Sequence, residues 1–397
     1  MLRCRSSFQK FAMFDPATAA LVRDTVFVTC LAILFYTYAG YPLVLLLWAS
    51  KKRGPVGKAP ITPRVTVVIA AWNEGKRVSA RIENCLQQHY PFDRLDVVVV
   101  SDGSIDDTAI RVRGYDPARV TLVELETRMG KAVALNCGVA AARGEIIVFA
   151  DARQAFCPTA VAELVANFAD PRVGAVSGEL ILETAPGVEG TDGVGLYWRI
   201  EKWIRQKEAA IDSIVGATGA IYAIRRSLFE PLPPGTILDD LLTPMRIALR
   251  GYRIVFEKGA LAYDRVVNDY RSEFKRKVRT LAGNYQVVSL CPRLVQPWAN
   301  RLFVQFVSHK LCRLAAPVAL LGLFVSNLVH LGGWYTAAFA AQLIGYMMAL
   351  AGWALTRIGI RERLTTAAFT FCLLNYAALV GAVHFFKASR VRWEKAG

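Results

Sequence analysis

The sequence predicts an α/β domain that is built on a mostly parallel sheet and inserted between transmembrane helices. Three long stretches toward the chain ends carry no charged residue, and between them short β-branched runs alternate with helix-like segments. Hydrophobic residues make up 54% of the 397 positions and charged residues 20%, which excludes an intrinsically disordered chain. Because the apolar residues are concentrated in blocks, the sequence also excludes a simple soluble enzyme.

Asp, Glu, Lys and Arg are absent from residues 25–50, 314–356 and 364–386. A bilayer core about 30 Å thick needs about 20 apolar helical residues. The stretches therefore predict one membrane span, two spans joined at Gly332–Gly333, and one further span. The first is too long for a cleavable signal peptide, and no AxA-type site follows it. Residues 301–313 alternate bulky apolar and basic positions, as is typical of a helix in the membrane interface.

These stretches divide the chain into four parts. We expect an N-terminal tail with a transmembrane helix, a cytoplasmic α/β domain, amphipathic interfacial helices, and C-terminal transmembrane helices with a tail. Their respective bounds are residues 1–50, 51–270, 271–313 and 314–397.

The basic loops predict a multi-pass protein of the cell membrane with its α/β domain in the cytoplasm. Residues 51–53 follow the first span, and Arg357, Arg361 and Arg363 separate the last two; such loops favour the cytoplasmic side. Three later spans would nevertheless place the basic tail after residue 386 outside, against the same rule. Either one span is therefore re-entrant, or the number of spans differs by one.

The formal net charge of +16 is compatible with nucleic acid, or with anionic lipid and anionic substrates. A nucleic-acid partner is excluded because no soluble stretch carries a Lys/Arg stripe with interleaved aromatic residues. The eight cysteines form no CxxC pair, so the sequence predicts neither a disulfide framework nor a zinc site.

Four apolar runs predict neighbouring strands of a sheet that helices cover on both faces. The runs are residues 65–70, 96–100, 120–125 and 146–150, with helices expected at 75–88 and 131–142. Polar residues follow three of these strands: Asn73 and Glu74, Asp102, and Asp151. Ligands of such sheets bind at the carboxyl ends of the strands, so we expect one shared site. The absence of GxGxxG and of a P-loop motif excludes the two common phosphate-binding loops.

Four segments now carry a resemblance to a known family: VTVVIAAWNE, VVVVSDGSIDDT, GKAVALNCGVAAARGEIIVFADAR and TILDDLLTPMRIALRGYR. In their order and spacing they resemble the membrane-embedded family 2 glycosyltransferases of GT-A fold. This is the superfamily of cellulose, chitin and hyaluronan synthases and of ceramide glucosyltransferase. The resemblance covers residues 64 to about 290 and implies a Rossmann-like, mostly parallel sheet.

The resemblance implies a nucleotide-sugar site at the strand ends. Ala71, Asn73, Glu74 and Asp102 would contact the base and ribose, and Lys131 would lie near the diphosphate. Polar oxygens suit the hydroxyl and amide groups of base and ribose, whereas the phosphates require a cation.

Asp151 takes the first position of the family's DxD motif, which binds the diphosphate and its Mg²⁺ or Mn²⁺. The third position is Arg153, a cation in place of a carboxylate. Two interpretations follow. Either Asp151 holds the metal largely through water and substrate phosphate, or Arg153 itself supplies part of the positive charge at the nucleotide-sugar site.

The same resemblance assigns the acceptor side. Asp240 would be the general base that takes the acceptor proton during an inverting attack on the anomeric carbon. A helix N-cap pair is the alternative for Asp239 and Asp240. Gly219, Ala220, Asp239 and Trp198 would line the acceptor pocket, with packing along a helix face as the alternative for Trp198.

Arg276, Lys277 and Arg279 lie at the position of the family's QxxRW motif and would form a lid over the diphosphate. A basic helix on the membrane surface is the alternative, and the two are compatible. Thr280 stands where processive synthases have the motif's Trp, which weakens the case for polymerisation.

We therefore expect an inverting, membrane-bound hexosyltransferase that moves a sugar from a nucleotide diphosphate sugar to a hydroxyl acceptor during exopolysaccharide synthesis. A UDP-sugar is the expected donor. Two alternatives remain open: addition of one sugar to a membrane lipid, and a non-catalytic nucleotide-sugar-binding subunit of a synthase. Expected partners are membrane lipids and a polysaccharide or lipid acceptor. Because about four helices are few for a channel, an export or synthase subunit is a further expected partner.

Overall fold

The computed structural model describes residues 16–48, 56–183, 192–265, 270–330, 332–360 and 362–394, and its strands form one sheet. The strands are β1 Val65–Ala71, β2 Leu95–Asp102, β3 Val120–Leu125, β4 Ile146–Asp151, β5 Ala155–Phe156, β6 Val173–Glu183, β7 Ile221–Arg225 and β8 Arg253–Arg265. The helices are α1 Pro16–Phe35, α2 Tyr41–Trp48, α3 Gly75–Leu86, α4 Thr108–Arg113, α5 Lys131–Ala141, α6 Ala160–Ala166, α7 Asp192–Ile211, α8 Asp239–Leu249, α9 Tyr270–Leu290, α10 Phe303–Phe306, α11 Cys312–Val329, α12 Trp334–Arg357 and α13 Arg363–Glu394.

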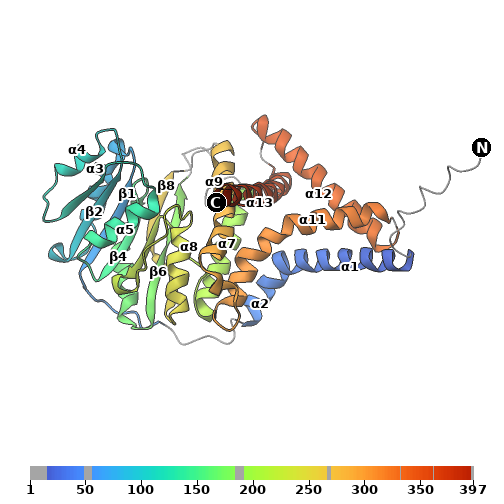
Figure 1. Ribbon diagram of the computed structural model, residues 1–397, viewed down its shortest axis with the longest axis horizontal. Coiled ribbons are helices and arrows are strands. Elements are labelled where there is room, and N and C mark those ends of the chain that lie inside the picture. Colours follow the sequence, from blue (N-terminus) through green and yellow to red (C-terminus); the bar gives the residue numbers. More distant parts are fainter. Residues whose placement is uncertain are drawn as a thin grey trace, which may run out of the picture.

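Strands β3, β2, β1 and β4 form a parallel unit at one side of the sheet (Figure 1). β1 lies between β2 and β4, and its Val67 pairs in register with Val97 and with Val148. The four strands and two helices expected in this region are confirmed, with ends that differ by at most two residues. The β-branched runs therefore predicted the strands correctly, and the polar residues after them marked where the strands end.

Both faces of the parallel unit are covered, which explains why its strands are continuously apolar. Val67 and Ile69 belong to a core shared with α3 and α6, whereas Val68 packs with α5 on the opposite face. The other half of the sheet is mixed. β7 runs antiparallel to β4 and β6, β8 is parallel to β6, and β5 is antiparallel to β8.

Among the described residues, four helical segments are long and apolar enough to cross a membrane. They are Ala17–Trp48, Phe303–Val329, Trp334–Arg357 and Arg363–Lys387. The predicted break at Gly332–Gly333 is confirmed, because α11 ends at Val329 and α12 begins at Trp334. We expected residues 301–313 in the interface; from Phe303 on, this segment is helical, continues directly into α11 and lengthens that candidate span.

The α/β domain and the candidate spans meet at α7 and α9. α13 packs against both of these helices, and α1 packs along α11. Phe274 of α9 stacks on Tyr376 of α13 with ring centroids 5.6 Å apart. In Figure 1, α13 is seen nearly end-on beside α9, whereas α1 and α11 run along the long axis of the picture.

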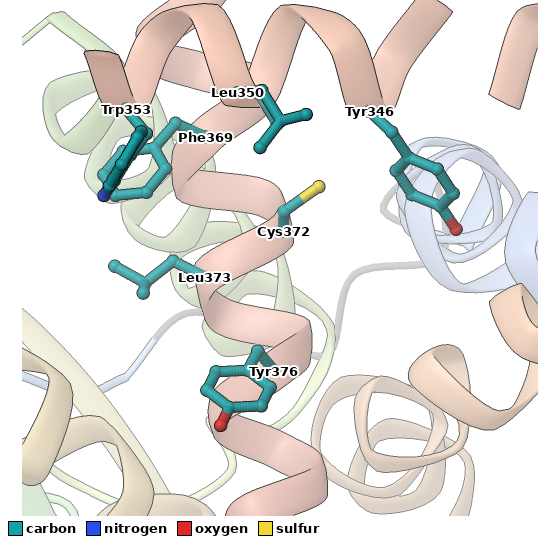
Figure 2. Close-up of a pocket in the computed structure, with 8 residues that line it drawn as sticks. Tyr346, Leu350, Trp353, Phe369, Cys372, Leu373 and Tyr376 are labelled. Atoms are coloured by element: carbon teal, nitrogen blue, oxygen red, sulfur yellow. The ribbon is translucent and has the colours of Figure 1, made fainter. Parts of the chain in front are cut away.

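An apolar groove of about 470 Å³ separates α12 from α13 (Figure 2). Aromatic and aliphatic side chains of both helices line it: Tyr346, Ala349, Leu350, Trp353, Phe369, Cys372, Leu373 and Tyr376. Because its lining is mostly apolar, the groove suits a hydrocarbon chain better than a sugar. The stack of Tyr376 on Phe274 connects one end of the groove to α9.

Candidate active site

Three segments that are distant in the sequence meet at the ammonium group of Lys131. This residue begins α5, and its Nζ lies 3.0 Å from Oδ1 of Asp151 at the end of β4. The same Nζ lies 3.4 Å from Oδ1 of Asp239 at the start of α8. The predicted donor and acceptor residues therefore share one cluster of charges.

The cluster keeps Lys131 in its charged form. Burial alone would lower the pKa of this lysine, but the carboxylates of Asp239, Asp151 and Asp240 raise it well above its ordinary value. The side chain is nevertheless 36% exposed, so a ligand can reach its ammonium group. A fixed cation at the carboxyl ends of the strands suits the phosphates of a nucleotide.

Asp102 organises the loop that leads into α5. Its carboxylate accepts hydrogen bonds from the N–H groups of Met129 at 2.7 Å and Gly130 at 2.9 Å, and the residue is 4% exposed. Gly130 has a φ of +92°, a conformation that residues with side chains rarely adopt. Asp102 thus fixes the start of α5 and, with it, Lys131. Its contact with base or ribose stays a prediction.

The turn after β1 is held against the loop between β2 and α4. Asn73 has a φ of +54°, which asparagine tolerates better than most residues. Its Oδ1 accepts a hydrogen bond from the N–H of Ile105 at 2.9 Å, and its own N–H donates to Oγ of Ser104 at 3.1 Å. Ala71 and Glu74 flank this turn, at the buried end of β1 and directly before α3. Their roles in nucleotide binding stay predictions.

Trp72 and Arg128 form a pair at the donor edge that the sequence reasoning missed. The guanidinium carbon of Arg128 lies 3.6 Å from the ring centroid of Trp72, which is 44% exposed. Arg128 directly precedes the segment that Asp102 binds. An exposed aromatic ring at a nucleotide site is a surface on which a base can stack. The available signal was a tryptophan in an otherwise polar strand-end turn.

Arg153, at the third position of the DxD motif, pairs with a carboxylate of the protein. Its guanidinium group donates to Oδ2 of Asp264 in β8, and the same oxygen accepts a hydrogen bond from Gln154 at 3.0 Å. Asp264 is 5% exposed, so much of the positive charge of Arg153 is balanced internally. This pairing favours the interpretation in which Asp151, and not Arg153, serves the diphosphate.

Asp151 is the strand-end carboxylate that the DxD motif assigns to a divalent cation. Within the part of the chain that the structure describes, no group of three or more His, Cys, Asp or Glu side chains is arranged to hold a metal alone. Mg²⁺ commonly binds through one or two carboxylates together with substrate phosphates. Asp151, whose side chain is 39% exposed, fits this mode, in which the substrate completes the coordination.

Asp239 and Asp240 open α8 and have different surroundings. Asp239 is 4% exposed, and besides facing Lys131 it accepts a hydrogen bond from the hydroxyl of Tyr222 at 3.3 Å. Asp240 is half-buried. Burial and the charge of Asp239 raise the pKa of Asp240 to about 6, against the opposing charges of Lys131 and Lys310. A carboxylate of this kind can take a proton near neutral pH.

Residues 214–220, the acceptor loop, carry the predicted Gly219 and Ala220 and contact Asp240 directly. The N–H of Ala217 donates to the backbone oxygen of Asp240 at 2.7 Å. A β-carbon on Gly219 would lie 2.8 Å from Oδ2 of Asp240, so glycine leaves the room that this carboxylate needs. Ala220, the next residue, is buried. Helix capping does not explain the aspartates, because Leu238 occupies the N-cap position and no side chain caps the helix.

Two further predictions concern α7 and α9. The side chain of Trp198 lies outside the described residues, although its backbone belongs to α7. The predicted lid residues 276–279 lie on α9, whose Gln286 accepts a hydrogen bond from the N–H of Ile237 at 2.8 Å. This bond holds α9 against the turn that leads into Asp239. The lid itself stays a prediction.

Comparison with known proteins agrees with these motifs. Residues 66–232 match the family described as Glycosyl transferase family 2. Poly-beta-1,6-N-acetyl-D-glucosamine synthase of Staphylococcus aureus is 24% identical over 229 residues, which cover 56% of this chain and 55% of that protein. The probable glycosyltransferase YdaM of Bacillus subtilis is 28% identical over 239 residues, which cover 57% and 56%. The chain thus spans about half the length of these relatives.

A solved structure shares the arrangement of sheet and flanking helices. The mannosyltransferase PcManGT of Pyrobaculum calidifontis, in complex with GDP-Man and Mn²⁺, is 25% identical with a TM-score of 0.72. The similarity covers 92% of this chain and 99% of that one. With the family match and the motif order, it leads to one conclusion: the α/β domain of this chain has the GT-A fold, and its residues 66–232 match glycosyl transferase family 2.

Proposed function

We propose that the protein is a membrane-bound, inverting glycosyltransferase that moves a sugar from a nucleotide diphosphate sugar to a hydroxyl acceptor. The observation that carries this proposal is the bridge from Asp151 through Lys131 to Asp239, with Asp240 beside it. Lys131 in this bridge is a cation that suits phosphate, and Asp240, the neighbour of Asp239, is a carboxylate that suits proton removal. A non-catalytic sugar-binding subunit needs only the first of these groups.

In the proposed reaction Asp240 takes the proton of the acceptor hydroxyl. The acceptor oxygen bonds to the anomeric carbon while the bond from that carbon to the diphosphate breaks, which inverts the centre. The proton remains on the carboxylate of Asp240, and the electron pair leaves with the nucleoside diphosphate. Lys131 stabilises the charge that develops on this leaving group, because its ammonium group is fixed at the strand ends.

A divalent cation is part of the proposal. Asp151 would hold it together with the oxygens of the diphosphate, and the bound cation would neutralise charge on the leaving group. The Pyrobaculum mannosyltransferase, solved with GDP-Man and Mn²⁺, supports this assignment. The pairing of Arg153 with Asp264 supports it too, because that arginine is already balanced by a carboxylate.

We propose a UDP-sugar as donor and a growing exopolysaccharide as acceptor. The name of the staphylococcal relative, a poly-beta-1,6-N-acetyl-D-glucosamine synthase, supports the choice of acceptor. The groove between α12 and α13 favours a membrane lipid as the second candidate acceptor, since its apolar lining suits a hydrocarbon chain. A polymer would require an export or synthase subunit as partner, whereas a single glycolipid would not.

We further propose that the α/β domain faces the cytoplasm and that α13 lies along the membrane surface. α13 packs against α7 and α9. Figure 1 shows α13 nearly end-on, whereas α1 and α11 run along the long axis of the picture. Three membrane crossings then remain, those of α1, α11 and α12. The basic loop between α12 and α13 and the basic tail after residue 386 then both lie on the cytoplasmic side, as the positive-inside rule requires. A C-terminal alkaline phosphatase fusion should therefore be inactive and a C-terminal fluorescent-protein fusion bright; an active phosphatase would contradict this arrangement.

Purified protein in proteoliposomes tests the activity. With Mn²⁺ or Mg²⁺ and a panel of UDP- and GDP-sugars, we expect nucleotide release that EDTA suppresses and that Asp240→Asn abolishes. Mass spectrometry of the product then separates a ladder of polymer lengths from a single glycolipid. Binding of a nucleotide sugar without any release by the wild-type protein would contradict the proposed activity and favour the non-catalytic subunit.

A further inference from the structure

A second cluster of buried charged side chains joins α7 to the membrane helix α11. His309 belongs to a π-helical turn, η7 Val307–Leu311, that leads into α11. Its Nε2 lies 2.9 Å from Oε1 of Glu201, and its Nδ1 lies 2.9 Å from Oε1 of Glu208. Both glutamates are on α7, and all three side chains are almost completely buried.

Both ring nitrogens of His309 face a carboxylate oxygen, an arrangement that a ring with two N–H groups satisfies in full. A neutral imidazole has one N–H, and its other nitrogen would then oppose a carboxylate oxygen. Glu201 also accepts from Nη1 of Arg313 at 2.9 Å, and Glu208 accepts from the hydroxyl of Tyr41 at 2.5 Å. Burial would raise the pKa of Glu201, but the charges of His309 and Arg313 lower it well below its ordinary value. Two buried carboxylates are thus balanced by an imidazolium and a guanidinium.

The network continues into the acceptor loop. Nε of Arg205 lies 3.5 Å from Oε1 of Glu201, and Nη1 of the same arginine donates to Oγ1 of Thr218 at 2.8 Å. The N–H of Val215 points to Oε2 of Glu208 at 3.5 Å. Thr218 immediately precedes the glycine that makes room for the proposed base. The charges on α7 therefore hold the loop from both of its ends.

The π-helical turn that holds His309 also contacts the N-terminal helix. A second π-helical turn, η2 Tyr36–Gly40, faces η7, and the hydroxyls of Tyr36 and Ser308 are 2.7 Å apart. Lys310 in η7 is among the charges that lower the pKa of Asp240. Single π-helical turns occur frequently at functional sites. η7 thus lies between η2 and the glutamates of α7.

We propose that His309 is a positioning residue for sugar transfer, whose imidazolium holds α7 and thereby the acceptor loop against Asp240. The inference rests on the proposed function. Without the imidazolium, two buried carboxylates on one helix lose a shared partner and repel each other, which favours water entry and loosening of α7. Among the described residues, the hydrogen bonds and ion pairs named above do not reach Asn73, Asp102 or Asp151, so we expect the strand ends of the donor side to keep their geometry.

His309→Gln tests the proposal in the full-length protein. Amide hydrogen exchange in detergent, measured by mass spectrometry, should become at least about tenfold faster in residues 214–220 and stay unchanged in residues 65–71. In proteoliposomes with the nucleotide sugar that the wild-type protein accepts, kcat should fall about tenfold while the donor KM changes less than about twofold.

A double variant and a control separate positioning from general damage. His309→Gln combined with Glu208→Gln should partly restore both the slow amide exchange in residues 214–220 and kcat. The reason is that the new amide at 309 donates to Glu201 and accepts from the new amide at 208. Ser308→Ala alters the same π-helical turn but removes only the bond to Tyr36, so both values should stay near wild type.

Unchanged exchange in residues 214–220 of the folded His309→Gln protein would overturn the proposal. Equal acceleration in residues 65–71, or no recovery in the double variant, would also overturn it by indicating general destabilisation. If the wild-type protein releases no nucleotide from any donor, the proposed function fails, but the exchange measurement still decides the role of His309.

Discussion

The donor side and the acceptor side of the site are built from different kinds of structure. The donor residues stand at the ends of β1, β2 and β4, three adjacent parallel strands within residues 65–151. The acceptor residues come from the loop after α7, the start of α8 and, through His309, the membrane helix α11. One side therefore follows from the topology of a sheet. The other exists only when distant helices pack together.

The largest expected effect is on the acceptor side, at the proposed base. Asp240→Asn should lower kcat about 10³-fold with unchanged donor affinity, because asparagine cannot take the acceptor proton. In the wild-type protein kcat should fall as the pH decreases below about 6, since the raised pKa of Asp240 then leaves the base protonated. A pH–rate profile and calorimetric titration with the donor check both. Near-normal activity of Asp240→Asn would assign the base to another residue.

The next effect lies where the two sides meet. Lys131→Met should lower kcat about 10²-fold and also raise the donor KM, because its ammonium group faces both Asp151 and Asp239. Steady-state kinetics measure both constants. Lys258→Met, at an exposed position of β8, is the matched control and should behave like wild type. A change confined to the donor KM would mean that Lys131 serves the donor side alone.

A smaller effect isolates the acceptor loop. Gly219→Ala should lower kcat about tenfold at constant donor KM, because the added methyl group would push against Oδ2 of Asp240. Gly345→Ala in α12 is the control, since nothing lies within 4 Å of its added carbon. If donor KM rises as much as kcat falls, the two sides are less separate than the geometry indicates.

The smallest effect should be confined to the donor side. Asp102→Asn retains one acceptor oxygen for the N–H groups of Met129 and Gly130 but loses the other. We expect the donor KM to rise about fivefold with little change in kcat. Titration with the nucleoside diphosphate measures the affinity directly. An effect on kcat larger than that of Gly219→Ala would contradict a donor-only role.

The sequence predictions were accurate for features that depend on neighbouring residues and missed contacts between distant segments. The strands, α3, α5 and the strand-end aspartates could be predicted because each belongs to a local unit of strand, turn and helix. The partner of Arg153 could not, because Asp264 lies in β8 and reaches it only through the pairing of β5 with β8. His309 was missed for a similar reason. In the sequence it lies between Ser308 and Lys310 in a stretch that alternates apolar and polar residues, and nothing there identifies the glutamates of α7 as its partners.

The order of residues along the chain determined the parallel sheet, its polar edge and the apolar helices around it, because periodicity and hydropathy are local properties. Tertiary structure alone decided that Asp239 is buried beside a lysine and that the pKa of Asp240 is raised to about 6. It alone also decided that Arg153 is already paired with a carboxylate. Electrostatic energies depend on distance through space and on burial. Neither quantity is encoded in the separation of two residues along a chain.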